Sequence, residues 1–182
     1  MKRIERTAYH EAGHVAACFV LRRRLCAVSI IPDEDTWGRV VRGLLFRHWA
    51  DIDEPDNRQR KAIQDHVVIS YAGPAAEKHA SGRQNTAGAM GDHACAIDLG
   101  KHYGHGSEKE LNLWLDWLAE RAANLVRTHW YFVEPVAREL LVRGQPSLKA
   151  VREILLTAAR QPYGSDLLAG VKIERVRRNG HA

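Results

Sequence analysis

The sequence predicts a mainly α-helical domain with one small β-hairpin, an α+β fold. Apolar residues recur at helical spacing through most of the chain, and residues 26–31 form one short β-branched run that ends at Pro32. With 182 residues, of which 45% are hydrophobic and 27% charged, the chain is long enough to bury one core. We therefore expect a single domain over residues 1–160 and a flexible C-terminal tail over residues 161–182.

Residues 3–24 are expected to form the first helix. Its second half is apolar nearly all round, which predicts that this helix runs through the interior of the domain. Its first half carries His10, Glu11 and His14, and such polar groups are costly to bury unless they are engaged by partners.

A β-hairpin is expected next. Residues 26–31 form its first strand, residues 33–35 the turn, and residues 37–41 the return strand. The free edge of such a strand can pair with an extended peptide, so Val28, Ser29 and Ile30 are candidates for contacting a substrate, and the hairpin partner is the alternative. A purely structural hairpin fits the sequence equally well.

The remaining chain reads as helices joined by short connections. An acidic loop over residues 47–57 precedes a second helix over residues 58–80. After a connection over residues 81–88, a third helix begins between Ala89 and Asp92. Residues 108–144 form two helices, and the last helix begins at Ser147 as its N-cap.

The stretch from His10 to His14 has the spacing of a zinc site. Two histidines four residues apart stand on one face of a helix, so that both imidazoles can bind one zinc ion. Glu11 is then placed to act as the general base of a metal-assisted hydrolysis. The alternative is a helix with polar residues on its wet face.

A zinc hydrolase needs a third protein ligand, and local spacing does not identify it. The candidates after His14 are Glu77, His79, Asp92, His93, Asp98, His102 and His105. For Asp92, which follows a glycine-rich connection, capping of the third helix is the competing role.

Four segments occur in a fixed order: residues 7–15 (TAYHEAGHV), residues 28–32 followed by Gly38, residues 71–77 (YAGPAAE) and residues 86–92 (TAGAMGD). In that order they resemble the zinc helix, the strand and turn, the second-helix signature and the aspartate segment of the peptidase domain of FtsH-type ATP-dependent zinc proteases. Two departures are Pro74, where an arginine is usual, and Gly91, where an asparagine is usual. Residues 119–156 fit the closing helices, so the resemblance spans most of residues 5–156.

The resemblance implies that His10, His14 and Asp92 are the zinc ligands and that Glu11 is the base. It also places Glu77 near the site, where we expect it to orient a ligand histidine, with an exposed salt bridge on the helix as the alternative. Family members carry an ATPase domain and transmembrane helices. The present sequence contains neither, nor a G-x-x-x-x-G-K-[ST] loop, so we expect a stand-alone peptidase domain that does not use ATP.

Composition argues against several other classes. The longest apolar run, residues 15–21, is too short to span a membrane, and no signal peptide opens the chain, which predicts a cytoplasmic protein. Three cysteines without C-x-x-C spacing indicate neither disulfides nor a cysteine metal site. The net charge of +5 is spread along the chain without interleaved aromatic residues, which argues against nucleic-acid binding.

The expected function is therefore that of a zinc-dependent metallopeptidase acting on flexible segments or small proteins. The alternative is a non-catalytic adaptor or regulatory module that keeps the fold and the Zn²⁺. The expected partner is a peptide or protein substrate, and the sequence leaves the oligomeric state open, a homo-oligomer included.

Overall fold

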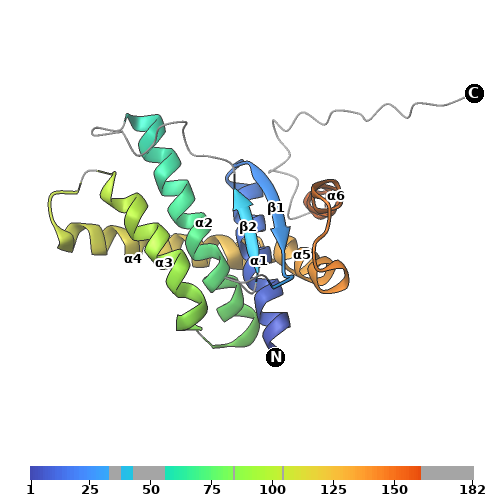
Figure 1. Ribbon diagram of the computed structural model, residues 1–182. Helices are drawn as coiled ribbons and strands as arrows, with labels where there is room; N and C mark the ends of the chain where they lie inside the picture. Colours follow the sequence, from blue (N-terminus) through green and yellow to red (C-terminus); the bar gives the residue numbers. More distant parts are fainter. Residues whose placement is uncertain (33–37, 43–55, 84, 104, 161–182) are drawn as a thin grey trace, which may run out of the picture.

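Helix α1 (Arg3–Val20) lies at the centre of the fold in the computed structural model, which describes residues 1–32, 38–42, 56–83, 85–103 and 105–160 (Figure 1). Around α1 are arranged β1 (Leu25–Ser29), β2 (Arg39–Arg42), α2 (Asn57–Ser81), α3 (Thr86–Lys101), α4 (Glu108–Thr128), α5 (Trp130–Arg143) and α6 (Leu148–Ala159). Six helices and one two-stranded antiparallel sheet, counted over the described residues, confirm the expected α+β fold class. Within the same residues, no helix has the length and apolar character needed to cross a membrane.

The interior position predicted for the first helix is confirmed, because every residue from His10 to Cys18 is buried. Helices α2 and α5 pack against α1, and the sheet covers a further part of it (Figure 1). The histidine and glutamate side chains of this helix therefore lie inside the protein, where polar groups need partners.

Helix α1 ends at Val20, four residues before the predicted end at residue 24. Arg22 adopts a left-handed conformation (φ 56°), and the backbone N–H groups of Arg22 and Arg23 donate to the carbonyls of Phe19 and Cys18. These two bonds form a Schellman-type helix end. The Arg23 side chain then binds Asp65 of α2 at 2.7 Å, a tertiary contact that the helical pattern could not reveal.

The predicted hairpin is confirmed, with Val28 opposite Val40, but its first strand begins at Leu25 and ends at Ser29. The Ile30 N–H instead donates to the carbonyl of Gly144, in the turn between α5 and α6, and Ile31 lies outside the strand. The expected turn, residue 37 at the start of the return strand, most of the acidic loop and the C-terminal tail lie outside the described residues.

Helices α1 and α2 cross at very short distance at Gly13. A Cβ atom at Gly13 would lie 2.4 Å from the carbonyl oxygen of Ala72 and 2.6 Å from Cβ of Ala76. Both contacts are too short for a carbon atom, so only glycine allows the two backbones to approach in this way. The crossing sets the face of α2 against the face of α1 that carries His10 and His14.

The later helices follow the prediction except at the start of α3. This helix begins at Thr86 because the Asn85 side chain accepts a hydrogen bond from the Gly88 N–H, so residues 86–88 belong to the helix and not to a connection. Helix α2 continues through Pro74. Ser147 caps α6 by accepting a hydrogen bond from the Ala150 N–H, as predicted.

Replacing Gly13 by alanine tests the crossing. Alanine favours helices, but here its Cβ would overlap α2, so we expect the free energy of unfolding to fall by about 1–3 kcal/mol. Gly91→Ala is the matched control, because nothing lies within 4 Å of its Cβ position in α3. That variant should gain up to about 1 kcal/mol in denaturant unfolding. Equal stability of the two variants would show that the crossing is not tight.

Candidate metal centre

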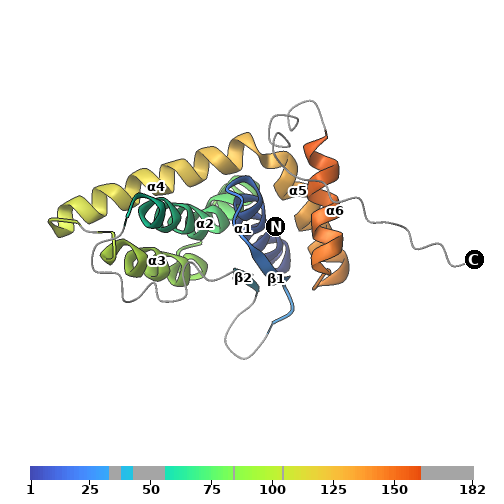
Figure 2. The same ribbon diagram turned by 90° about the horizontal axis from the view of Figure 1, so that it is seen from above.

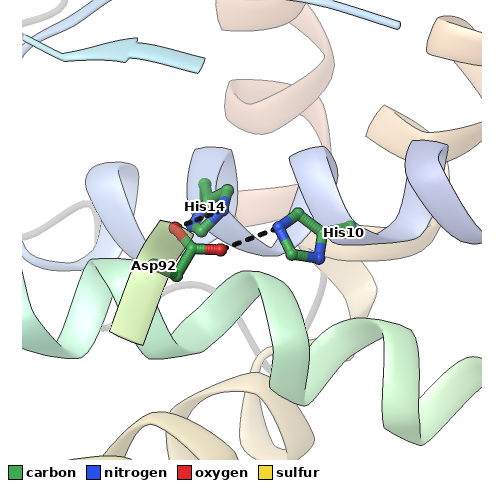
Figure 3. Close-up of side chains that lie close together, drawn as sticks. All are labelled: His10, His14 and Asp92. Carbon is green, nitrogen blue, oxygen red and sulfur yellow. Dashed lines mark hydrogen bonds and ion pairs between the residues drawn. The ribbon is translucent and has the colours of Figure 1, made fainter. Parts of the chain in front are cut away.

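Three side chains from two helices meet inside the protein. His10 and His14 come from α1 and Asp92 from α3 (Figure 3). The Nε2 atom of His10 lies 3.0 Å from Oδ2 of Asp92, and Nε2 of His14 lies 3.4 Å from Oδ1 of the same carboxylate. One potential ligand atom from each residue lies within 4.8 Å of the other two, which is the spacing that a single metal ion requires.

The outer nitrogen of each histidine has its own acceptor. Nδ1 of His14 donates to the backbone carbonyl of Ile69 at 2.7 Å, and Nδ1 of His10 faces Oε2 of Glu77 at 3.4 Å. With the protons on Nδ1, both Nε2 atoms could give their lone pairs to a metal ion, whereas without a metal ion a proton on Nε2 of His10 completes the hydrogen bond to Asp92. Metal-binding histidines characteristically have this second partner, which fixes the ring and its tautomer.

Gly73 of α2 makes room for the imidazole rings. A Cβ atom at this position would lie 2.4 Å from Nε2 of His14 and 2.8 Å from Nε2 of His10. The backbone of α2 therefore forms one wall of the cluster, as the ribbon beneath the two histidines in Figure 3 shows. Any larger residue would push both candidate ligand atoms aside.

The charges of the cluster favour a cation. Burial alone lowers the pKa of His10, but its hydrogen bonds to Asp92 and Glu77, together with the charges of Asp92 and Glu11, raise this pKa to about 10. Burial would raise the pKa of Asp92, but the charge of His14 and the hydrogen bonds to both histidines hold it well below its usual range. At neutral pH a proton on His10 thus offsets the carboxylates, and a bound metal ion would replace that proton.

Glu77 is buried, with 4% of its surface exposed, which excludes the alternative of an exposed salt bridge. Oε1 lies 3.8 Å from Nε of Arg6, and neither of these two buried atoms has a hydrogen-bond partner among the described residues. Burial raises the pKa of Glu77, but the hydrogen bond and charge of His10, the Asn85 side chain and Arg6 lower it overall. Glu77 is therefore a buried partner of the His10 ring.

Glu11 lies beside the cluster and is 5% exposed. Its Oε1 atom would lie 2.7 Å from a Cβ at Gly38, the residue that precedes β2. The carboxylate therefore packs directly under the start of this strand. The absence of a side chain at Gly38 is what leaves room for it.

The structure narrows the set of third-ligand candidates. Asp92 lies well inside α3, whose cap is Asn85, so the competing role as a helix cap is wrong. Among the described residues, no other group of three such side chains could hold a metal ion. The His79 ring packs at a tilt against Trp130, with ring centroids 4.4 Å apart, and Nδ1 of His93 is 2.9 Å from the Tyr71 hydroxyl. Asp98, His102 and His105 also lie outside the cluster.

Two features of the site were not predicted from the sequence. The Ile69 carbonyl carries no residue-type signal, since any residue could supply it. Arg6 precedes His10 on α1, and its ion pair with Glu77 links it to the site.

No family model matches the chain, and a search of curated proteins finds no match. The resemblance to FtsH-type peptidase domains therefore rests on the four segments quoted above.

Metal binding can be tested on the purified protein after removal of all metal. We expect roughly one zinc ion per chain by equilibrium dialysis with elemental analysis, and no stable binding in His14→Ala or Asp92→Ala. Glu77→Gln should weaken zinc binding about 10–100-fold, because the variant loses the carboxylate that holds His10. His93→Gln, next to Asp92 but outside the cluster, is the control that should bind as the wild type does. Unchanged zinc binding in Asp92→Ala would remove this residue from the site.

Proposed function

We propose that this chain is a zinc-dependent metallopeptidase that hydrolyses peptide bonds in flexible segments or small proteins without using ATP. The observation that supports this function best is the meeting of His10, His14 and Asp92 beside the buried carboxylate of Glu11. Two imidazoles and one carboxylate leave a coordination position open, which is characteristic of catalytic and not of structural zinc sites.

The donor set favours zinc over harder cations. Magnesium and calcium prefer sites built from oxygen ligands, whereas two histidines with one carboxylate suit zinc. When bound, zinc would supply Lewis acidity, which makes a water molecule more acidic and polarises a peptide carbonyl. His10 and His14 would hold it through Nε2, and Asp92 through its carboxylate.

Glu11 supplies the proton transfers in this proposal. Its carboxylate takes a proton from the attacking water and returns it to the nitrogen of the leaving amine, so that no charged amide nitrogen is expelled. Its place one residue after His10, with Oε1 directed towards Gly38, puts the carboxylate between the metal ligands and β2.

The extended substrate is better placed on β2 than on β1. Val28 and Ile30 are 1% and 3% exposed, Ser29 pairs with Arg39 in the ladder, and the Ile30 N–H is already bonded to Gly144. In both Figure 1 and Figure 2, β1 lies on the side of the sheet towards α6 and β2 on the other side. Among the described residues no further strand pairs with β2. A peptide added there would run past Gly38 and Glu11.

The placement of the four resembling segments also supports a peptidase related to the FtsH type. Four parts of these segments lie far apart in the sequence, and each contributes to the site or to its wall: His10 to His14, Gly38, Gly73 to Glu77, and Asp92. Segments matched only by chance would have no reason to converge.

Glu11→Gln tests the chemistry. Glutamine keeps the shape of the side chain but cannot accept the proton, so we expect cleavage of an unfolded casein substrate to fall at least about 100-fold while zinc stays bound. Glu153→Gln, on the outer part of α6, is the control with the same chemical change. Full activity in Glu11→Gln would exclude Glu11 as the base. Zinc binding by the wild type without cleavage of any of a wide range of unfolded substrates would favour the non-catalytic adaptor.

Gly38→Ala tests the contact between Glu11 and the hairpin. The added methyl group would lie 2.7 Å from Oε1 of Glu11 and 2.6 Å from Cγ2 of Thr7. We expect kcat to fall about tenfold or more with zinc content unchanged, because a displaced base loses its alignment with the attacking water. Gly106→Ala, before α4, should leave kcat unchanged. Loss of zinc from Gly38→Ala would mean that the strand supports the ligands and not the base.

A further inference from the structure

A concave surface lies on the other part of α1, away from the metal cluster. It is a groove of about 310 Å³, open to solvent, between the C-terminal end of α1, the middle of α2 and the C-terminal part of α4. Figure 2 shows α4 running alongside α2 and passing α1. The groove is lined by Val20, Val68, Arg121, Asn124, Leu125, Thr128 and His129. Val20 lies roughly 9 Å along α1 from His14.

The lining has an apolar floor and a cationic rim. Val20, Val68 and Leu125 form the apolar part, and Arg121 is the one residue with a permanent charge among the described residues that line the groove. Within the part of the chain that the structure describes, no carboxylate belongs to the lining. The guanidinium of Arg121 lies 5.0 Å from the centre of the Trp117 ring, a cation–π contact that holds it at the surface.

Further positive charge lies where α1 ends. Arg23 and Lys61 both form ion pairs with the single carboxylate of Asp65. These three side chains together therefore carry a net charge of one positive unit. Arg24 follows and is exposed. The acidic residues of α4 nearest to Arg121 in the sequence are Glu120, which accepts a hydrogen bond from Asn124, and Asp116. This end of the molecule therefore favours an acidic ligand.

An exposed apolar strip extends the groove along α4. Trp117 and Leu113 are 50% and 62% exposed and stand one and two turns, respectively, before Arg121 on the same face. From Leu113 to His129 the strip and groove cover roughly 24 Å of helix. A surface of this length that is open along one side fits a chain segment better than an enclosed small molecule.

We propose that this face of α4, with the groove beside it, docks an acidic amphipathic segment of a partner protein. One apolar side chain of the segment enters the groove over Leu125, others lie on Trp117, and its carboxylates face Arg121 and Arg24. Docking requires neither the metal nor Glu11, so it is independent of the proposed peptidase activity.

Binding is measured with the full chain carrying Glu11→Gln, by fluorescence polarisation. The probe is a labelled synthetic peptide of about 16 residues, with leucine and tryptophan at helical spacing and glutamate at its polar positions. Its counterpart carries lysine in place of each glutamate. We expect the acidic peptide to bind with a Kd of roughly micromolar order and the basic peptide to bind at least about tenfold more weakly.

Two variants locate the binding. Arg121→Glu reverses the charge at the rim, and Thr128→Trp fills the groove without changing charge. Each should weaken binding of the acidic peptide about tenfold or more. Lys149→Glu makes the same charge change on the exposed first turn of α6 and should leave the Kd within about twofold. Circular dichroism confirms that each variant is folded, and if Arg121→Glu is not, Thr128→Trp carries the test alone.

Three results would overturn the proposal. Equal affinity of the wild type and Thr128→Trp for the acidic peptide would show that the groove takes no part. Equal weakening by Lys149→Glu and Arg121→Glu would reduce the binding to overall charge. Tighter binding of a labelled single-stranded DNA than of the peptide, with a steep salt dependence, would assign the surface to nucleic acid.

Discussion

The close crossing of α1 and α2 at Gly13 is the constraint on which the rest of the structure depends. Because no side chain separates the backbones there, α2 lies against the face of α1 that carries the two histidines. The Ile69 carbonyl then reaches Nδ1 of His14, and Gly73 lies where the imidazole rings need space. A wider crossing would remove both the hydrogen bond between His14 and the Ile69 carbonyl and the close approach of Gly73 to the imidazole rings. Packing of small residues, rather than any polar contact, thus sets the geometry of the candidate site.

Electrostatics adds a second requirement, because three acidic side chains act on the buried ring of His10. Asp92 and Glu77 contact this ring from α3 and α2, and Glu11 adds its charge from the neighbouring position on α1. These three carboxylates are stable around the buried ring only when a positive charge lies between them, either a proton on His10 or a metal ion. Binding a metal ion would therefore also tie α1 to α3, and this link between metal and fold is common in small metal-binding domains.

Much of this fold could be predicted from the sequence because its signals are local. Helical spacing of apolar residues located the helices, and the spacing of His10, Glu11 and His14 placed them together on one helix. What escaped prediction depends on tertiary contacts. Helix α1 ends at Val20, where the left-handed turn at Arg22 leads into the ion pair of Arg23 with Asp65 of α2. Local spacing could not select Asp92 among the third-ligand candidates either, because only the folded chain brings α3 to α1.

A metal ion is expected in the space between the Nε2 atoms of His10 and His14 and the carboxylate of Asp92. Anomalous diffraction at the zinc absorption edge, from crystals of the protein grown with zinc, measures that space directly. We predict a single strong peak within about 2.0–2.2 Å of both Nε2 atoms and of one oxygen of Asp92, with Glu11 outside the coordination sphere. Ordered His10, His14 and Asp92 side chains without an anomalous peak between them, or zinc bound only at other residues, would contradict the proposed zinc site.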